Sequence, residues 1–450
     1  MANDPIKHVV VLMLENNSFD RMLGCMKSVY PELDGIDPDA PFMNPDYPDR
    51  THEFAQLPDA KRSVPVDPAH DLDDVIRQVD GGTCKGFVRD LAQHKPQAPE
   101  DERYQIMAYF KRGDLPVLHT LAEQFAVCDH WFSSVPGPTW PNRFFVNSGT
   151  SLGHTDMPEG IFHPHIHLYD QPTVFERLSE KGIPWRIYFG DVPQTLVMLK
   201  QLEYPMHYRR MEHFDTDMAN SADQLPQYIF IEPSYFGAGE NDQHPPTDVM
   251  HGERLIANVY NALRKNQDLW QSTLFVLLYD EHGGFCDHVV PPSTISPDDH
   301  TQQFAFDELG VRVPALLISP WVDPGVLDTV FDHTSLLKYL TDKWQLGPLG
   351  DRVPKANSFA TALSKRSSPR TDCPEPLPLP DANPIDGNAP LNAHQVALAG
   401  FTHHLEINHT KPGMESIAAH SSAMAQGFLA QSEAVTNRIE EFLSRVISKV

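Results

Sequence analysis

The sequence predicts an α/β fold with a mostly parallel central sheet flanked by helices. Segments with helical periodicity alternate with short apolar runs over roughly 330 residues, and such alternation is typical of parallel sheets. Polar residues come directly after several of these apolar runs. In open α/β sheets, ligand sites form at the carboxyl ends of strands, which is where these polar residues would lie. The predicted strands cover residues 8–14, 185–189, 228–231, 273–278 and 313–322.

Composition restricts the classes of function. The chain has 450 residues, 40% of them hydrophobic, and a formal net charge of -26, which argues against nucleic-acid binding. No apolar run approaches the ~18 residues of a membrane span, and no export signal is visible after Met1. We therefore expect a cytoplasmic protein, or a secreted or periplasmic one if a signal was removed. Five widely spaced cysteines predict reduced thiols, without a disulfide framework or a zinc motif.

The first predicted strand ends at an acid and an amide. Glu15 and Asn16 follow residues 8–14, and Asn17 and Ser18 then provide good caps for a helix. A cap and a functional site are compatible here, because helix N-termini beside strand ends often bind anions.

The segment from 27 to 143 carries two candidate site residues. Residues 27–66 are predicted to be a long loop, after which His70 opens a helix that ends near residue 78; alone, this histidine is typical of a cap or a surface position. Residues 104–125 show helical periodicity. Thr139 then stands among three prolines, where it is either a plain helix N-cap or a nucleophile at the positive end of a helix dipole.

Histidines mark the middle of the chain. His163, His165 and His167 alternate along an extended segment, where they form either a metal cluster or an exposed loop. His244 follows the predicted strand at 228–231 and precedes a predicted helix at 248–265. It is either a phosphate ligand or general acid, or an ordinary loop histidine.

The run Asp280-Glu281-His282-Gly283-Gly284 follows the predicted strand at 273–278. Two adjacent carboxylates repel each other, and a hard cation would offset that repulsion. The alternative is a solvated acidic turn.

The C-terminal part has a different composition. Residues 368–390 are rich in proline and predict a linker or an ordered wrap. Apolar residues between Val435 and Val450 form one helical face that needs a partner, either the main domain or a second subunit. We therefore predict a catalytic domain at 1–367 and a wrap with C-terminal helices at 368–450, with a possible homo-oligomer through the last helix.

Four ordered motifs together carry a resemblance. They are Glu15-Asn16-Asn17-Ser18-Phe19-Asp20, Pro138-Thr139-Trp140-Pro141-Asn142-Arg143, Asn241-Asp242-Gln243-His244-Pro245-Pro246 and Asp280-Glu281-His282-Gly283-Gly284-Phe285. The chain resembles the bacterial phosphoesterase family of phosphatidylcholine-type phospholipases C and acid phosphatases, and the plant non-specific phospholipases C.

The resemblance implies an alkaline-phosphatase-like α/β sandwich with a bound metal ion. It implies that Thr139 is both nucleophile and metal ligand, and that His70 and His244 contact the phosphoryl group. The other implied metal ligands are Glu15, Asn16, Asp280 and Glu281. Asn17 and Trp140 depart from the family pattern, which implies a different substrate rim.

The expected function is metal-dependent hydrolysis of phosphoric esters, with phospholipase C cleavage of a phospholipid through a phosphothreonine intermediate as the leading hypothesis. The alternatives are an acid phosphatase acting on small soluble phosphate esters and a non-catalytic lipid- or protein-binding module. Hard oxygen ligands favour Ca²⁺, Mg²⁺ or Mn²⁺, while zinc and iron are compatible with a carboxylate-rich site.

Overall fold

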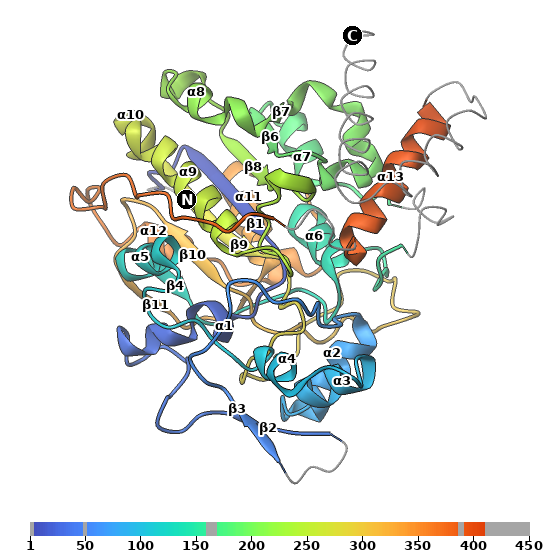
Figure 1. The fold of residues 1–450 in the computed structure, drawn as a ribbon. Helices are drawn as coiled ribbons and strands as arrows, with labels where there is room; N and C mark the ends of the chain where they lie inside the picture. Colours follow the sequence, from blue (N-terminus) through green and yellow to red (C-terminus); the bar gives the residue numbers. More distant parts are fainter. Residues whose placement is uncertain (1–3, 48–51, 159–168, 386–390, 410–450) are drawn as a thin grey trace.

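The computed structural model describes residues 4–47, 52–158, 169–385 and 391–409 (Figure 1). An eight-stranded sheet in the order β11-β4-β10-β9-β1-β8-β6-β7 runs through the molecule. Every neighbouring pair is parallel except the two that involve β10, so the predicted mostly parallel sheet is confirmed. The strands are β1 His8–Leu14, β4 Ala126–Cys128, β6 Trp185–Phe189, β7 Tyr208–Arg210, β8 Tyr228–Glu232, β9 Thr273–Tyr279, β10 Ala315–Ile318 and β11 Gly325–Leu327.

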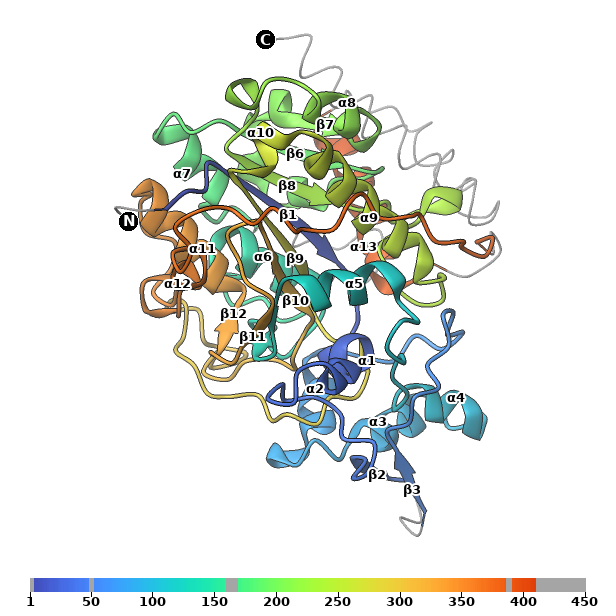
Figure 2. The same ribbon diagram turned by 90° about the vertical axis from the view of Figure 1, so that its left-hand side faces the viewer.

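Helices cover both faces of the sheet (Figures 1 and 2). One layer contains α5, α8, α9 and α10, and the other contains α6, α7 and α11. The helices are α1 Phe19–Leu23, α2 Leu72–Val79, α3 Phe87–His94, α4 Glu100–Gln105, α5 Pro116–Gln124, α6 Thr139–Ser148, α7 Val174–Glu180, α8 Phe214–Met218, α9 Met250–Lys265, α10 Gln267–Trp270, α11 His333–Trp344, α12 Ala360–Leu363 and α13 Ala393–His409.

The two central strands, β1 and β9, are buried along their whole length. Both are runs of apolar residues rather than alternating patterns, as expected for strands covered on two faces. They pair in parallel over seven residues, from His8 with Thr273 to Leu14 with Tyr279. Because the register is in step to the last pair, both strands end at the same level of the sheet.

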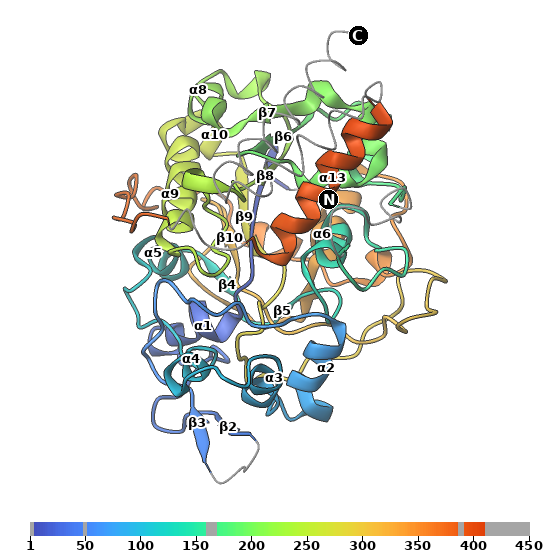
Figure 3. The same ribbon diagram turned by 45° about the vertical axis from the view of Figure 1, so that its right-hand side comes forward.

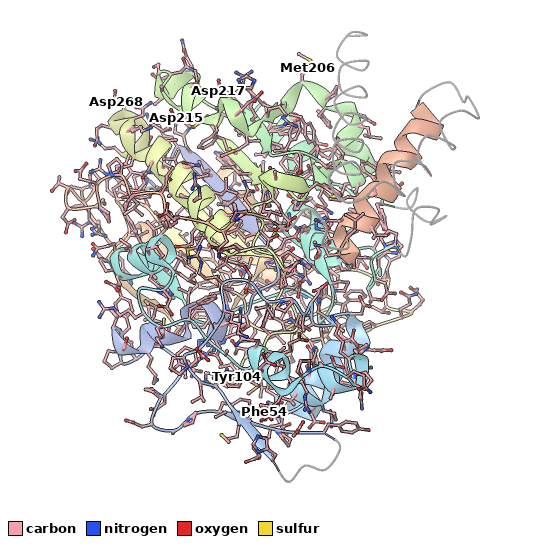
Figure 4. The ribbon with its side chains drawn as sticks, viewed as in Figure 1. Phe54, Tyr104, Met206, Asp215, Asp217 and Asp268 are labelled. Atoms are coloured by element: carbon pink, nitrogen blue, oxygen red, sulfur yellow. The ribbon has the colours of Figure 1, made fainter. Side chains whose placement is uncertain are left out.

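A small second core lies beyond these strand ends. It includes Phe54 of β3 (Glu53–Ala55), which pairs with β2 (Met43–Pro45), and Tyr104 of α4 packs against it (Figure 4). Phe285 and Cys286, just after β9, belong to the same core. The turn that follows β9 is therefore held by packing on its far side.

Several local predictions were wrong. The predicted helix at 104–125 is helical only at its start, where α4 ends at Gln105, and from Pro116 to Gln124 in α5. Gly113 adopts φ 92° in the non-helical segment between them, and Pro116 starts α5. The predicted loop at 27–66 contains the β2–β3 hairpin. The predicted strand at 313–322 pairs only over β10, because prolines at 314 and 320 lack an N–H for the ladder.

Other expectations are settled only in part. All five cysteines are free, as the sequence predicted, and the structure shows that all five are buried. No helix in the described part of the chain combines the length and apolarity needed to cross a lipid bilayer. The histidines at 163, 165 and 167 and the final helical face, with its predicted oligomer contact, lie outside the described residues.

The proline-rich segment lies along α9 as an ordered strap, which we define as residues 369–385. Tyr260 Oη donates to the carbonyl of Pro374 at 2.6 Å, and Asn261 exchanges two hydrogen bonds with the backbone of Leu377. Nearer the start of the helix, the Asn383 amide donates to Asp248 at 2.8 Å. The wrap is thus observed, whereas the division into domains at residue 367 stays a prediction.

His119 of α5 predicts a pH-dependent stability. Its ring contacts the Met22 carbonyl and the Gly113 amide, and burial lowers its pKa from 6.5 to about 4. The unfolded chain therefore takes up the proton first, so stability contributed by neutral His119 is present above pH 6.5 and lost as the pH falls through about 4.

We expect His119→Ala to lower the free energy of unfolding by about 2–3 kcal/mol at pH 8 and by clearly less at pH 4. Urea unfolding at the two pH values measures this difference. His300→Ala, at an exposed position, is the control. An equal loss at both pH values would contradict a neutral, hydrogen-bonded role for His119.

Candidate active site

The ends of β1 and β9 bring the predicted acids together. The Asp280 amide donates to the Leu14 carbonyl at 3.1 Å, and the Asn16 amide donates to Asp280 Oδ1 at 3.2 Å. The Asn17 amide donates to the Glu281 carbonyl at 3.1 Å. The two loops after the strands are therefore hydrogen-bonded to each other. Four predicted ligands are buried at their junction: Glu15, Asn16, Asp280 and Glu281.

The junction needs unusual backbone conformations. Asn16 has φ 55°, in the left-handed region that asparagine tolerates better than most residues. Gly283 has φ 63°, and a Cβ built on it would lie 2.4 Å from the Asn16 carbonyl oxygen. Glycine is therefore required at 283 for the two loops to approach this closely.

Helix α6 carries the predicted nucleophile to this junction. Thr139 is the first residue of the helix, Pro138 is the N-cap, and the buried Thr139 Oγ1 has no hydrogen-bond partner among the described residues. The hydroxyl therefore does not cap the helix, and the plain N-cap interpretation was wrong.

Arg143 joins α6 to both strand ends. Its Nε donates to Asp280 Oδ2 at 2.9 Å, and its Nη2 lies 3.1 Å from Glu15 Oε1. Residues four apart on a helix share a face, so Thr139 lies on the side of α6 that faces the acids. Arg143 was not predicted as a site residue, although its spacing of four from Thr139 within the motif at 138–143 could have pointed to it.

Five buried oxygen atoms at the junction have no hydrogen-bond partner among the described residues. They are Glu15 Oε1 and Oε2, Asn16 Oδ1, Thr139 Oγ1 and Glu281 Oε1. Unsatisfied buried oxygens are costly, and a cation satisfies several at once. These residues therefore fit a hard metal ion. Asp280 differs, because its two oxygens already accept hydrogen bonds from Arg143 and from the Asn16 and Glu281 amides.

In the described chain, two groups bring the ligating atoms of at least three acids or histidines close together: Asp20, Asp287 and His288, and Asp74, Asp90 and His94. The predicted acids Glu15, Asp280 and Glu281 do not form such a group among themselves. In the first group, Asp20 and Asp287 already pair with Arg312 at 3.0 and 2.9 Å. Neither group contains a residue that the sequence analysis named as a ligand, so side chains able to hold a metal exist at more than one place.

The two predicted histidines lie on one side of the acids. His70 Nε2 is 3.2 Å from Asn16 Nδ2 and 3.6 Å from Glu281 Oε1. The His244 ring lies 6.4 Å from the His70 ring, centroid to centroid, and its Nδ1 donates to the Pro245 carbonyl at 2.5 Å. That bond leaves His244 Nε2 facing Asp67, whose Oδ1 is 3.8 Å away.

Charges in the buried cluster are strongly coupled. Burial raises the pKa of the Asp280 carboxyl to about 7, with Glu15 and Glu281 adding to the rise and Arg143 opposing it. Burial alone would raise the pKa of Glu15, but His394 and Arg143 outweigh it and lower that pKa to about 2. Burial lowers the pKa of His244, yet Asp67 and Glu15 raise it above the ordinary value. Burial also opposes protonation of His70, yet Glu281 and Asp67 raise its pKa to about 9, so cations of the protein itself offset part of the negative charge.

The two departures from the family pattern do not lie at an exposed rim. Asn17 and Trp140 are both buried. The Asn17 amide donates to the Glu15 and Gln243 carbonyls, and Trp140 packs edge-on against Tyr169. These two residues therefore do not themselves form an exposed substrate rim.

Fold and site together define an α/β phosphoric-ester hydrolase. The chain belongs to the Phosphoesterase family, whose profile matches residues 6–347.

Relatives come from plants and bacteria. The chain is 36% identical to non-specific phospholipase C3 of Arabidopsis thaliana, over 85% of this chain and 78% of the relative. It is 38% identical to non-specific phospholipase C6 of the same plant, over 86% and 77%. It is 27% identical to phospholipase C B of Mycobacterium tuberculosis, over 86% and 84%. The resemblance drawn from the motifs is therefore confirmed.

Solved structures with a similar fold include a protein of the alkaline phosphatase superfamily from Vibrio parahaemolyticus. Its TM-score is 0.33 at 13% identity, covering 54% of this chain and 64% of that one. A phosphonate monoester hydrolase from Silicibacter pomeroyi has a TM-score of 0.32 at 13% identity, covering 58% and 73%.

Arg143 provides a test of the charge balance. We expect Arg143→Leu to lower the free energy of unfolding by about 3–5 kcal/mol in EDTA, because two buried carboxylates lose their partner. Excess Mn²⁺ is expected to recover part of this loss, since a cation can replace the missing charge. Urea unfolding with and without Mn²⁺ measures both effects.

The matched control is Lys265→Leu, which removes an exposed ion pair with Asp215 of 2.8 Å (Figure 4). Such pairs contribute about 0–1 kcal/mol. A similar small loss for Arg143→Leu would show that the buried acids do not depend on Arg143.

Proposed function

We propose that this chain is a metal-dependent phospholipase C that works through Thr139. One observation carries the proposal: an unpartnered buried hydroxyl starts the helix whose Arg143 pairs with acids at two strand ends, where carboxylate and amide oxygens are also unpartnered. The relatives named as phospholipases C in plants and bacteria support a phospholipid as the substrate.

In this proposal Glu15, Asn16, Glu281 and Thr139 would hold the cation. Asp280 would join them by the lone pairs that its hydrogen bonds leave free. Hard oxygen donors favour Ca²⁺, Mg²⁺ or Mn²⁺ over a metal that prefers thiolates. A bound divalent ion supplies two things, a lower pKa for the attacking hydroxyl and charge neutralisation of a phosphoryl oxygen.

The chain's own residues then divide the work. Thr139 Oγ1, after its proton has passed to solvent water, attacks phosphorus, and the bond to the diacylglycerol oxygen breaks as the new bond forms. The leaving alkoxide needs a proton, which His244 Nε2 can give because Nδ1 is held by the Pro245 carbonyl. His70, buried beside Asn16 and Glu281, would hold a phosphoryl oxygen in place. Water then frees the phosphorylated head group from Thr139.

Removing the nucleophile tests this mechanism. We expect Thr139→Ala to lower kcat at least about a thousandfold, because no other group can form the covalent intermediate. Thr139→Ser is expected to keep measurable turnover, since it retains the hydroxyl. Rapid quenching and mass spectrometry of the wild type should detect a phosphorylated peptide containing Thr139. Full metal-dependent turnover by Thr139→Ala would exclude Thr139 as nucleophile.

Substrate choice is tested with three compounds: phosphatidylcholine vesicles, a bis-aryl phosphate and an aryl phosphate. A phospholipase C should hydrolyse the first two, because both are diesters with a leaving group in line with the attack. Rates are measured with Mn²⁺ and again after chelation by EDTA, which is expected to abolish them. Activity confined to the aryl phosphate would instead favour an acid phosphatase on small soluble esters.

A further inference from the structure

The beginning of α13 lies against the candidate active site. Figures 1 and 3 show this end of the helix beside α6, and the contacts confirm the placement. Asn392 and Gln395 exchange hydrogen bonds of 3.0 and 2.8 Å between side chain and backbone, which caps the helix. The Gln395 amide also donates to the Tyr235 carbonyl at 2.6 Å. The helix start is thus anchored on the loop that follows β8.

One side chain from this helix reaches the acids. His394 is 1% exposed, and its Nδ1 lies 2.6 Å from Glu15 Oε1. Two lone pairs would repel at this distance, so Nδ1 must carry a proton that faces the carboxylate. The approach is oblique for a hydrogen bond, and neither ring nitrogen has an aligned partner among the described residues.

Glu15 therefore lies between two donors. Arg143 Nη2 is 3.1 Å from the same oxygen, Oε1, that His394 contacts. Tyr235 supports both donors, because its hydroxyl accepts from Arg143 at 2.8 Å and its ring lies 4.6 Å from that of His394. Neither oxygen of Glu15 has an aligned hydrogen bond, but the two close contacts with positive or N–H groups are both to Oε1, which leaves Oε2 available to a cation.

We infer that His394 is a positioning residue for the metal site, which acts by holding the Glu15 carboxylate so that Oε2 points to the cation. The inference rests on the proposed function, because it assumes that Glu15 binds metal. His394 acts through Glu15, because the ring nitrogen beside that carboxylate, Nδ1, carries a proton and so offers no lone pair to a cation.

His394, which contacts the candidate active site, therefore lies outside the part of the chain that matches the family profile. That match ends at residue 347, whereas His394 follows the strap that lies along α9. The strap thus brings to the site a donor that the matched region lacks.

Two variants of His394 distinguish the effect of its N–H group on Glu15 from the effect of its packing. Asn and Leu have nearly the same shape, but only Asn places an N–H group at the position of the histidine Nδ1. We expect His394→Leu to weaken Mn²⁺ binding about ten- to a hundredfold, as loss of a group that orients a metal ligand commonly does. His394→Asn is expected to bind Mn²⁺ within about threefold of the wild type. Isothermal titration of the full chain with Mn²⁺ alone measures both.

His251→Leu is the matched control, because His251 contacts the same strap through the Asn383 carbonyl at 2.8 Å and does not contact Glu15. It should bind Mn²⁺ like the wild type. Equal affinities for His394→Leu and His394→Asn, whether both normal or both weak, would overturn the inference. Failure of the proposed metal site is distinguishable, because Glu15→Gln would then bind Mn²⁺ as tightly as the wild type.

Discussion

The structure of the site depends on one buried ion-pair bridge, in which Arg143 joins Glu15 and Asp280. Placing two carboxylates together at the ends of neighbouring strands is unfavourable in a low-dielectric interior unless positive charge lies between them. Arg143 supplies that charge from α6, with one guanidinium shared between the tips of β1 and β9. The same bridge holds α6 against the strand ends, and Thr139, one helical turn earlier, lies on the same face of α6 as Arg143.

Backbone pairing provides the precision that the ion pairs require. Strands β1 and β9 stay in register up to Leu14 and Tyr279, so their first residues beyond the sheet emerge side by side. Close passage of the following loops is possible only because Gly283 has no side chain near Asn16. The register of β1 and β9 thus fixes where the acidic residues beyond the strands lie, and Arg143 provides the positive charge between them.

Much of this arrangement could be predicted from the sequence. Long apolar strands such as β1 and β9 are self-evident patterns, and polar residues at their ends predict a site on general grounds. Strands β4, β7 and β11 were missed because three residues cannot display a period. The break before α5 was missed because one glycine and one proline interrupt a helical pattern that continues on both sides.

Partners that act across the chain could not be read from local patterns. Arg143 is the last residue of one quoted motif, and no residue near it in the sequence indicates that its guanidinium contacts two acids far away in the chain. His394 is still further from any recognisable motif, and only the path of the strap along α9 brings it to Glu15. Local sequence reports which residues can do chemistry, whereas the donors that orient them are chosen by tertiary contact. A family profile that ends before the strap therefore describes the reacting groups without all of the contacts that hold them in place.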